Sequence, residues 1–167
     1  KEIFKFPVAY MAEAGYWTQT DDEASNLGAY LRKGGFLIFD DFRGGDWANF
    51  EAQMQRVLPG IRIVELEVSH PIFHAVFDLK EKPQIPSIDA ALRGRSQGIT
   101  WERADAQEVH YKGIYDDKGR MMAIICHNTD LGDGWEEEGV DEWYFREFSE
   151  NKAYPLGINI VFYAMTH

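Results

Sequence analysis

The chain has 167 residues, of which 45% are hydrophobic and 14% aromatic, so it can build a packed core, and a disordered chain is excluded. Its net charge is -11, from 28 acidic and 17 basic residues, and this charge would repel a phosphate backbone, which argues against nucleic acid as a partner. A single cysteine, Cys126, excludes an internal disulfide framework and a cysteine zinc site.

The first half of the chain alternates predicted strands and helices. The apolar spacing predicts strands over residues 6–12, 35–40 and 61–66. Between them it predicts helices over residues 18–33 and 46–58. Thr18 or Thr20 is expected to cap the first helix and Asp46 the second. Gly34 suits the position just after the first helix. Short connections of this kind are typical of right-handed crossovers between parallel strands.

The second half is less regular. His70 or Ser69 before Pro71 predicts one short helical turn, and a loop is expected from there to about residue 95. Residues 101–107 remain ambiguous. Residues 112–115 and 120–126 predict a hairpin, and a charged insertion follows at 129–152. Residues 154–166 predict a last helix that is apolar nearly all round, and we expect it to be well buried.

These elements predict an α/β fold in three layers, α/β/α, with a mostly parallel sheet, a hairpin and a loop insertion. Residues 1–167 are expected to form a single domain. No apolar run reaches the roughly 18 residues of a membrane-spanning helix, so no membrane span is expected. The start of the chain lacks the pattern of an export leader.

Polar residues follow three of the predicted strands, where ligands bind in open parallel sheets. The expected binding rim is made of Glu13, Tyr16, Trp17, Asp40, Asp41, Arg43, His127, Asn128, Asp130, Asp133 and Trp135. We expect the ends of these strands to converge.

Two interpretations of Asp40, Asp41, His127 and Asp130 stay open. Carboxylates with an imidazole suit a divalent metal or general acid/base chemistry. Alternatively, Asp40 and Asp41 accept hydrogen bonds from loop amides and hold the loop in shape, as aspartates at strand ends often do. No ligand spacing here is diagnostic. No cofactor is therefore predicted, and a divalent metal is kept as the alternative.

Cys126 and His127 are neighbours on a strand and point to opposite faces, so they cannot serve each other as nucleophile and base. A buried structural thiol is the favoured interpretation of Cys126. His70 and His74 have metal-ligand spacing on a helix, but the helix is one turn at most. A capping His70 and a packed His74 are therefore preferred, and His110 is expected to be exposed.

Residues 131–138 are rich in glycine but also acidic, which opposes a phosphate-binding loop. We expect this segment to turn tightly and to lay Trp135 against the body of the domain. The five tryptophans also allow a carbohydrate-stacking surface, although core packing is the commoner role.

Five segments carry a resemblance to a known family: LRKGGFLIFDDF, WANFEAQMQRVLP, SHPIFHAVFDL, GIYDDKGRMMAIICHNTDLGDGWE and YPLGINIVFYAMTH. The chain closely resembles the bacterial family known as domain of unknown function 4159, and the resemblance covers nearly the whole chain. It implies a class I glutamine amidotransferase-like, flavodoxin-like fold and an extracytoplasmic, envelope-associated setting. The cysteine elbow of the amidotransferases is missing here, and the resemblance implies no catalytic residues.

Two functions follow as hypotheses. The favoured one is a noncatalytic module that binds a small molecule or a protein. The alternative is a metal- or carboxylate-dependent hydrolase that uses Asp40, Asp41, His127 and Asp130, with a carbohydrate-related substrate as one option. An exposed strand edge near the start of the chain would also allow pairing with a second copy, giving a homo-oligomer.

Overall fold

The computed structural model describes residues 2–167. Its sheet has five strands in the order β1-β2-β5-β4-β3. The strands are β1 (Val8–Met11), β2 (Phe36–Phe42), β3 (Ile63–Glu65), β4 (His110–Tyr115) and β5 (Met121–His127). β1 pairs with β2, and β2 with β5, in parallel, whereas β4 runs antiparallel to both β5 and β3. The α/β class is confirmed, and the sheet is mixed.

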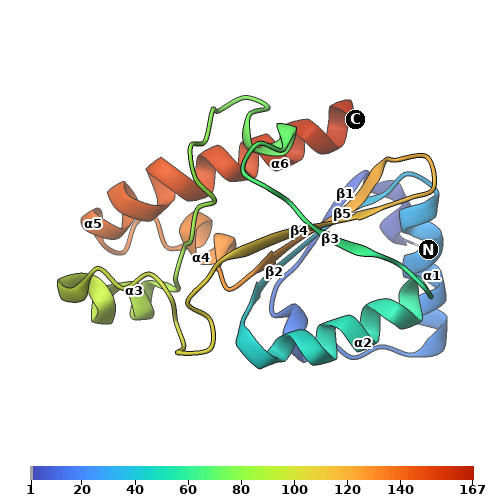
Figure 1. Cartoon of the computed structure of the whole chain (residues 1–167), viewed down its shortest axis with the longest axis horizontal. Coiled ribbons are helices and arrows are strands. Elements are labelled where there is room, and N and C mark those ends of the chain that lie inside the picture. The colour runs from blue at the N-terminus through green and yellow to red at the C-terminus, as the bar shows by residue number, and fades with distance from the viewer. Residues whose placement is uncertain (1) are drawn as a thin grey trace.

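Among residues 2–167, six α-helices accompany the sheet, and Figure 1 shows their arrangement. They are α1 (Asp21–Arg32), α2 (Trp47–Val57), α3 (Ile88–Gly94), α4 (Leu131–Glu136), α5 (Glu142–Tyr144) and α6 (Tyr154–Thr166). A π-helical segment, η6 (Phe145–Ala153), joins α5 to α6. Within residues 2–167, no helix has both the length and the apolar character needed to cross a membrane.

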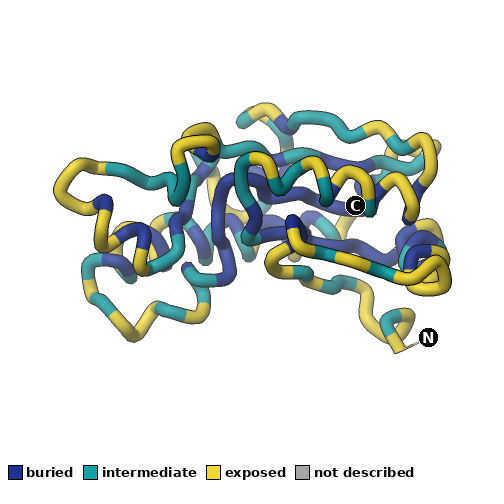
Figure 2. Tube along the Cα trace, turned by 90° about the horizontal axis from the view of Figure 1, so that it is seen from below, coloured by how far each residue is buried: buried dark blue, intermediate teal, exposed yellow. Residues whose placement is uncertain are grey.

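Strand alternation divides the core between the two faces of the sheet. Phe36, Ile38 and Ile124 pack with α6, while Leu37 and Phe39 pack with α1 and α2 on the other face. Helices therefore cover both faces, and the central strands β2 and β5 are buried along almost their whole length (Figures 1 and 2).

The local signals of the first helix act as expected. Thr20 is the N-cap of α1, and it forms a capping box in which its hydroxyl accepts from the amide of Glu23 while the Glu23 carboxylate accepts from the amide of Thr20. Asp46 stands at the N-cap position of α2 but makes no capping bond there. Its carboxylate instead lies 3.4 Å from the guanidinium of Arg103.

The position predicted for the third strand is wrong. The segment 61–66 was expected to continue a series of parallel crossovers, but among the described residues β3 pairs only with β4, antiparallel, at the far edge of the sheet. The edge of β2 that a crossover would have used is occupied by β5, which comes about eighty residues later in the chain.

Three other expectations need correction. The stretch expected to be loop up to residue 95 contains α3, and the expected loop insertion at 129–152 is largely helical, with α4, α5 and η6. The last helix is buried on one side only: Phe162 and Met165 are 48% and 59% exposed. The cause is that α6 has apolar residues on more of its circumference than the sheet can cover.

Candidate functional site

The candidate site lies where β1, β2 and β5 end, next to one another. Each strand is followed or ended by a non-glycine residue with left-handed backbone: Glu13 at φ 52°, Asp41 at φ 57° and Asn128 at φ 64°. Among residues 2–167, no other residue except glycine has a positive φ. This conformation is uncommon for residues with a Cβ, and such strain concentrates at functional sites. We call this edge the rim.

Asp40 is buried at the centre of the rim, with no exposed surface. Its Oδ2 accepts a hydrogen bond from the Tyr10 hydroxyl at 2.7 Å and another from the amide of Gly132 at 2.9 Å. Its Oδ1 is buried and has no hydrogen-bond partner among the residues described. Burial raises the pKa of Asp40 to about 7, against the opposing effect of the Tyr10 hydrogen bond.

Asp130 begins α4 directly after β5. Its Oδ1 accepts from the amide of Asp133 at 2.9 Å, so it caps the helix. Asp130 is 4% exposed, and burial together with the neighbouring Asp40 raises its pKa to about 9. It therefore carries a proton at neutral pH, and the rim holds a carboxylic acid beside a buried carboxyl that titrates near neutrality.

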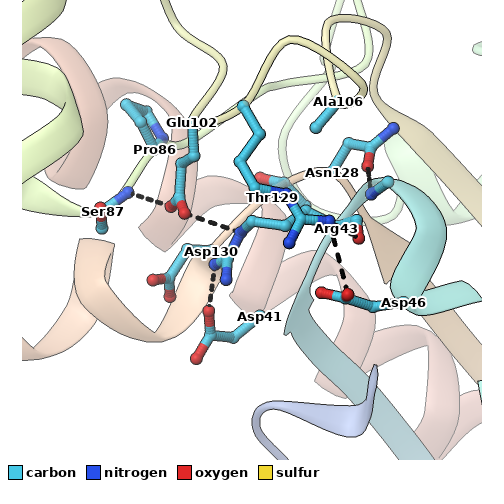
Figure 3. Close-up of polar contacts among 12 residues, drawn as sticks. Asp41, Arg43, Asp46, Pro86, Ser87, Glu102, Ala106, Asn128, Thr129 and Asp130 are labelled. Atoms are coloured by element: carbon cyan, nitrogen blue, oxygen red, sulfur yellow. Dashed lines mark hydrogen bonds and ion pairs between the residues drawn. The ribbon is translucent and has the colours of Figure 1, made fainter. Parts of the chain in front are cut away.

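Arg43 lies between two carboxylates (Figure 3). Its Nε is 2.6 Å from Glu102, and its Nη2 contacts Asp41. All three side chains are largely shielded from solvent, at 15–20% exposed. Asp130 lies beside this cluster in Figure 3. The cluster ties the end of β2 to the segment 101–107, which the sequence left ambiguous.

Asn128 fixes the loop after β2. Its Oδ1 accepts from the amide of Gly44 at 2.7 Å, and its Nδ2 donates to the carbonyl of Glu108 at 2.7 Å. This is a scaffolding role, because both ends of the amide are engaged by backbone.

His127 lies on the other face of the sheet from Asp40. Ile38 pairs with Ile124, so alternation places Asp40 with Cys126, and His127 points toward α2. Its ring packs against Phe42 and Trp47, and its Nε2 is 3.2 Å from the carbonyl of Gly44. Burial lowers its pKa to about 4, so the ring is neutral at neutral pH.

This placement separates His127 from the carboxylates with which it was grouped as a metal set. Within residues 2–167, no three His, Cys, Asp or Glu side chains are arranged to hold a metal ion. Cys126 is fully buried, and burial raises the pKa of its thiol well above the ordinary value, so the thiol is protonated.

The remaining rim residues differ in what they offer. Tyr16 is 65% exposed, whereas Trp17 packs on Phe39 and Phe50 in the core. Asp133 accepts from the amide of Ile88. Trp135 belongs to the helix α4, not to a tight turn; its ring packs on Tyr10 with centroids 5.7 Å apart.

His70 and His74 lie away from the rim, whereas His110 pairs with His127 at the end of β5, with ring centroids 6.2 Å apart. His70 caps the turn at Pro71–Phe73 by accepting from the amide of Ile72, as expected. The expectation that His74 is packed in the core is wrong, because its side chain is 36% exposed. Its ring instead bonds to Asp78 and to the carbonyl of Val68 near the surface. His110 is half-buried beside Glu65 at 3.3 Å and not freely exposed, because β4 lies inside the sheet.

Sequence reasoning missed Tyr10 and Glu102. Tyr10 had a signal: it shares a face of the sheet with Asp40 if β1 and β2 pair in the register Tyr10 with Ile38. Glu102 had none, because only the tertiary fold brings the segment 101–107 to the rim.

Fold and site together define an α/β protein with a strained, carboxylate-rich rim at the ends of adjacent parallel strands. The chain belongs to the family described as domain of unknown function (DUF4159), whose model matches residues 1–165. A search of curated proteins gave no match.

Proposed function

We propose that the chain is a noncatalytic binding module that takes a partner carrying a basic group at the rim. One observation carries the proposal: three adjacent strands end in strained left-handed residues that are not glycine, at Glu13, Asp41 and Asn128. A glycine at each position would remove the strain. The Asn128 side chain scaffolds the loop after β2, whereas the carboxylates of Glu13 and Asp41, kept there at a cost in stability, are expected to serve recognition.

Charge defines the chemistry of the partner. Glu13, Asp41, Glu102 and Asp133 all border the rim, and Arg43 already bonds two of them. The rim therefore has an excess of negative charge, on a chain whose net charge is -11. Such a surface attracts an ammonium or guanidinium group and repels anions. A basic segment of a protein or a small cationic ligand fits this field.

The burial of the reactive groups supports binding over catalysis. Asp40 and Cys126 have no exposed surface, and Asp130 is 4% exposed, so a substrate has little access to them. A general acid or base must come within hydrogen-bond reach of the substrate. Glu13 is the exposed carboxylate of the rim, and Asp41, at 20% exposed, is more accessible than Asp40 or Asp130.

A titration of the isotope-labelled chain with a tetra-lysine peptide, followed by amide chemical shifts, tests the proposal. We expect shifts at Glu13, Asp41 and Gly44, and a several-fold weaker affinity in the double variant Glu13→Gln, Asp41→Asn. The double variant Glu51→Gln, Glu67→Gln is the matched control, because it changes the net charge equally elsewhere. Equal weakening in both variants, or shifts scattered over the surface, would contradict the proposal.

A second function has one observation in its favour. Asp40 and Asp130 are adjacent carboxyls with pKa values raised to about 7 and 9, and such groups are typical of acid/base sites. A carboxylate-dependent hydrolase would use them with Asp41, on a carbohydrate-related substrate as one option. A panel of glycoside and ester substrates tests it, with and without divalent metal. Turnover that is lost in Asp130→Asn would favour the hydrolase and overturn the binding module.

The finer fold and the location also belong to this proposal. Helices on both faces and the parallel β1, β2 and β5 support a three-layer, flavodoxin-like and amidotransferase-like fold. The envelope-associated, extracytoplasmic setting rests on the family resemblance. Fractionation of the native cells with an antibody to this chain tests the location, and recovery in the cytoplasmic fraction would contradict it.

A further inference from the structure

Helix α6 carries two apolar stripes, and the sheet covers only one. Leu156, Ile160 and Tyr163 are buried against the sheet. A second stripe, spaced three and four residues apart, remains between 45% and 59% exposed and consists of Ile158, Val161, Phe162 and Met165. The helix has no charged residue between Tyr154 and Thr166. An uncharged apolar stripe of this kind is characteristic of a contact surface.

The open stripe forms one wall of an apolar groove with a volume of about 740 Å³. Val8 and Tyr10 of β1 line the opposite side, Ile38 lies between them and the helix, and Trp135 stands among the lining side chains. The groove therefore runs along the edge strand of the sheet.

The backbone of β1 is open along the same side. In the part of the chain that the structure describes, β1 is the last strand of the sheet and pairs only with β2. The amide of Phe36 donates to the carbonyl of Pro7 at 2.9 Å, so the backbone groups of Pro7, Ala9 and Met11 face β2. Alternation then directs the N–H and C=O of Val8 and Tyr10 toward the open edge.

The two edge strands of the sheet, β1 and β3, differ in the charges they carry. At the β3 edge, Glu65 bonds to Lys82 at 2.7 Å and lies 3.4 Å from Lys112, so charges guard that strand. β1, with the sequence VAYM, has no charge. Proteins protect exposed edges with charges, proline or bulges, and an unguarded apolar edge is a site for pairing with another strand.

We propose that a second copy of this chain occupies the groove, with the two β1 strands paired antiparallel about a two-fold axis at Ala9. Val8 of each copy then lies opposite Tyr10 of the other. Val8 and Tyr10 of each copy offer one outward-facing N–H and one outward-facing C=O apiece. The pair of strands therefore has four donors and four acceptors, and all of them form hydrogen bonds across the seam. The axis is perpendicular to the sheet, so both α6 helices lie on the same face, and their open stripes meet above the seam.

The observations favour a second copy over the other occupants. A small apolar ligand would fill the groove but leave the backbone groups of Val8 and Tyr10 unpaired. A second copy would cover the apolar groove and also pair the backbone groups of Val8 and Tyr10. The β1 strand of this chain can pair with itself in this way about the two-fold axis at Ala9. β1 and α6 carry no charged side chain, so the paired strands and the meeting stripes bring no like charges of their own into contact.

Molar mass from light scattering, measured over a concentration series, tests the proposal. We expect the wild type to approach twice the chain mass of 19.2 kDa as concentration rises. Phe162→Glu places a charge in the stripe, and Val8→Pro removes an outward-facing N–H that the fold of one copy does not use. Both variants are expected to stay at 19.2 kDa with unchanged circular dichroism. Val140→Glu, at an apolar residue 63% exposed elsewhere, is the control and should dimerise as the wild type does.

Amide hydrogen exchange adds a readout at the seam itself. The amides of Val8 and Tyr10 should be protected at high concentration and exchange fast on dilution, while those of Ala9 and Met11 stay protected throughout. A wild type that remains monomeric up to its solubility limit would overturn the proposal, as would a dimer that survives both Phe162→Glu and Val8→Pro. The rim variant Glu13→Gln, Asp41→Asn should dimerise normally, so this proposal and the proposed function can fail separately.

Discussion

The Tyr10 hydroxyl donates a hydrogen bond to Oδ2 of Asp40 at 2.7 Å and so joins the ends of β1 and β2 inside the protein. The same tyrosine ring packs on Trp135 and lines the groove beside α6. Tyr10 therefore connects the buried carboxyl at the centre of the rim with the apolar surface at the edge of the sheet. Replacing Tyr10 or Asp40 should therefore affect both the rim and the groove.

Tyr10→Phe removes one of the two hydrogen bonds to Asp40 Oδ2. That bond lowers the pKa of Asp40, which burial raises to about 7, so its loss should raise the pKa further. The variant should be destabilised by about 1–3 kcal/mol at pH 8, where the carboxyl is charged, and by less at pH 5. Urea unfolding at the two pH values measures this. Tyr16→Phe, at an exposed ring, is the control, and equal losses in both variants would contradict the account.

Asp130→Asn should change the pH dependence of stability. The pKa of Asp130 is raised from 3.8 to about 9, chiefly by burial, so between these values the folded chain holds a proton that the unfolded chain releases. Its stabilising contribution is thus complete below pH 3.8 and is lost as the pH rises toward 9. The wild type should lose more unfolding free energy than the variant between pH 5 and pH 8, by at least about 1.4 kcal/mol.

Asparagine can still accept the capping bond from Asp133, so the variant should fold. Asp117→Asn, at an exposed turn residue, is the matched control and should follow the wild-type curve. Parallel curves for wild type and Asp130→Asn would show that the buried carboxyl does not titrate as described.

His127 should remain neutral well below the ordinary titration range of histidine. Burial lowers its pKa from 6.5 to about 4, and the carbonyl of Gly44 at 3.2 Å from Nε2 favours the tautomer with the proton on that nitrogen. Two-dimensional nitrogen–proton spectra of the ring at pH 6 should show the neutral Nε2–H form. A ring that titrates near pH 6.5 would contradict the burial of His127 against Phe42 and Trp47.

Local features of the fold could be predicted from the sequence. The cap of the first helix, expected at Thr18 or Thr20 and found at Thr20, and the hairpin of β4 and β5 depend on residues close in the chain, and both are present. The position of β3 was not predictable, because it depends on β5 occupying the edge of β2. Whether His127 joins Asp40 was also beyond the sequence: it depends on the register that pairs Ile38 with Ile124.

The strain at the rim was equally hidden from sequence reasoning. Glycine, the usual marker of left-handed backbone, is missing at Glu13, Asp41 and Asn128. The exposed stripe of α6 was missed for a different reason. An apolar helix face has the same sequence pattern whether a sheet covers it or a second molecule does.

The measurement that tests the central claim most directly compares Glu13→Gly and Glu13→Gln for stability and for tetra-lysine affinity. Glycine relieves the left-handed strain at φ 52°, so Glu13→Gly should raise the free energy of unfolding by about 1 kcal/mol, while Glu13→Gln leaves it unchanged. Both variants lack the carboxylate and should bind the peptide several-fold more weakly than the wild type. Wild-type affinity in both variants would contradict the claim that the strained rim is kept for binding.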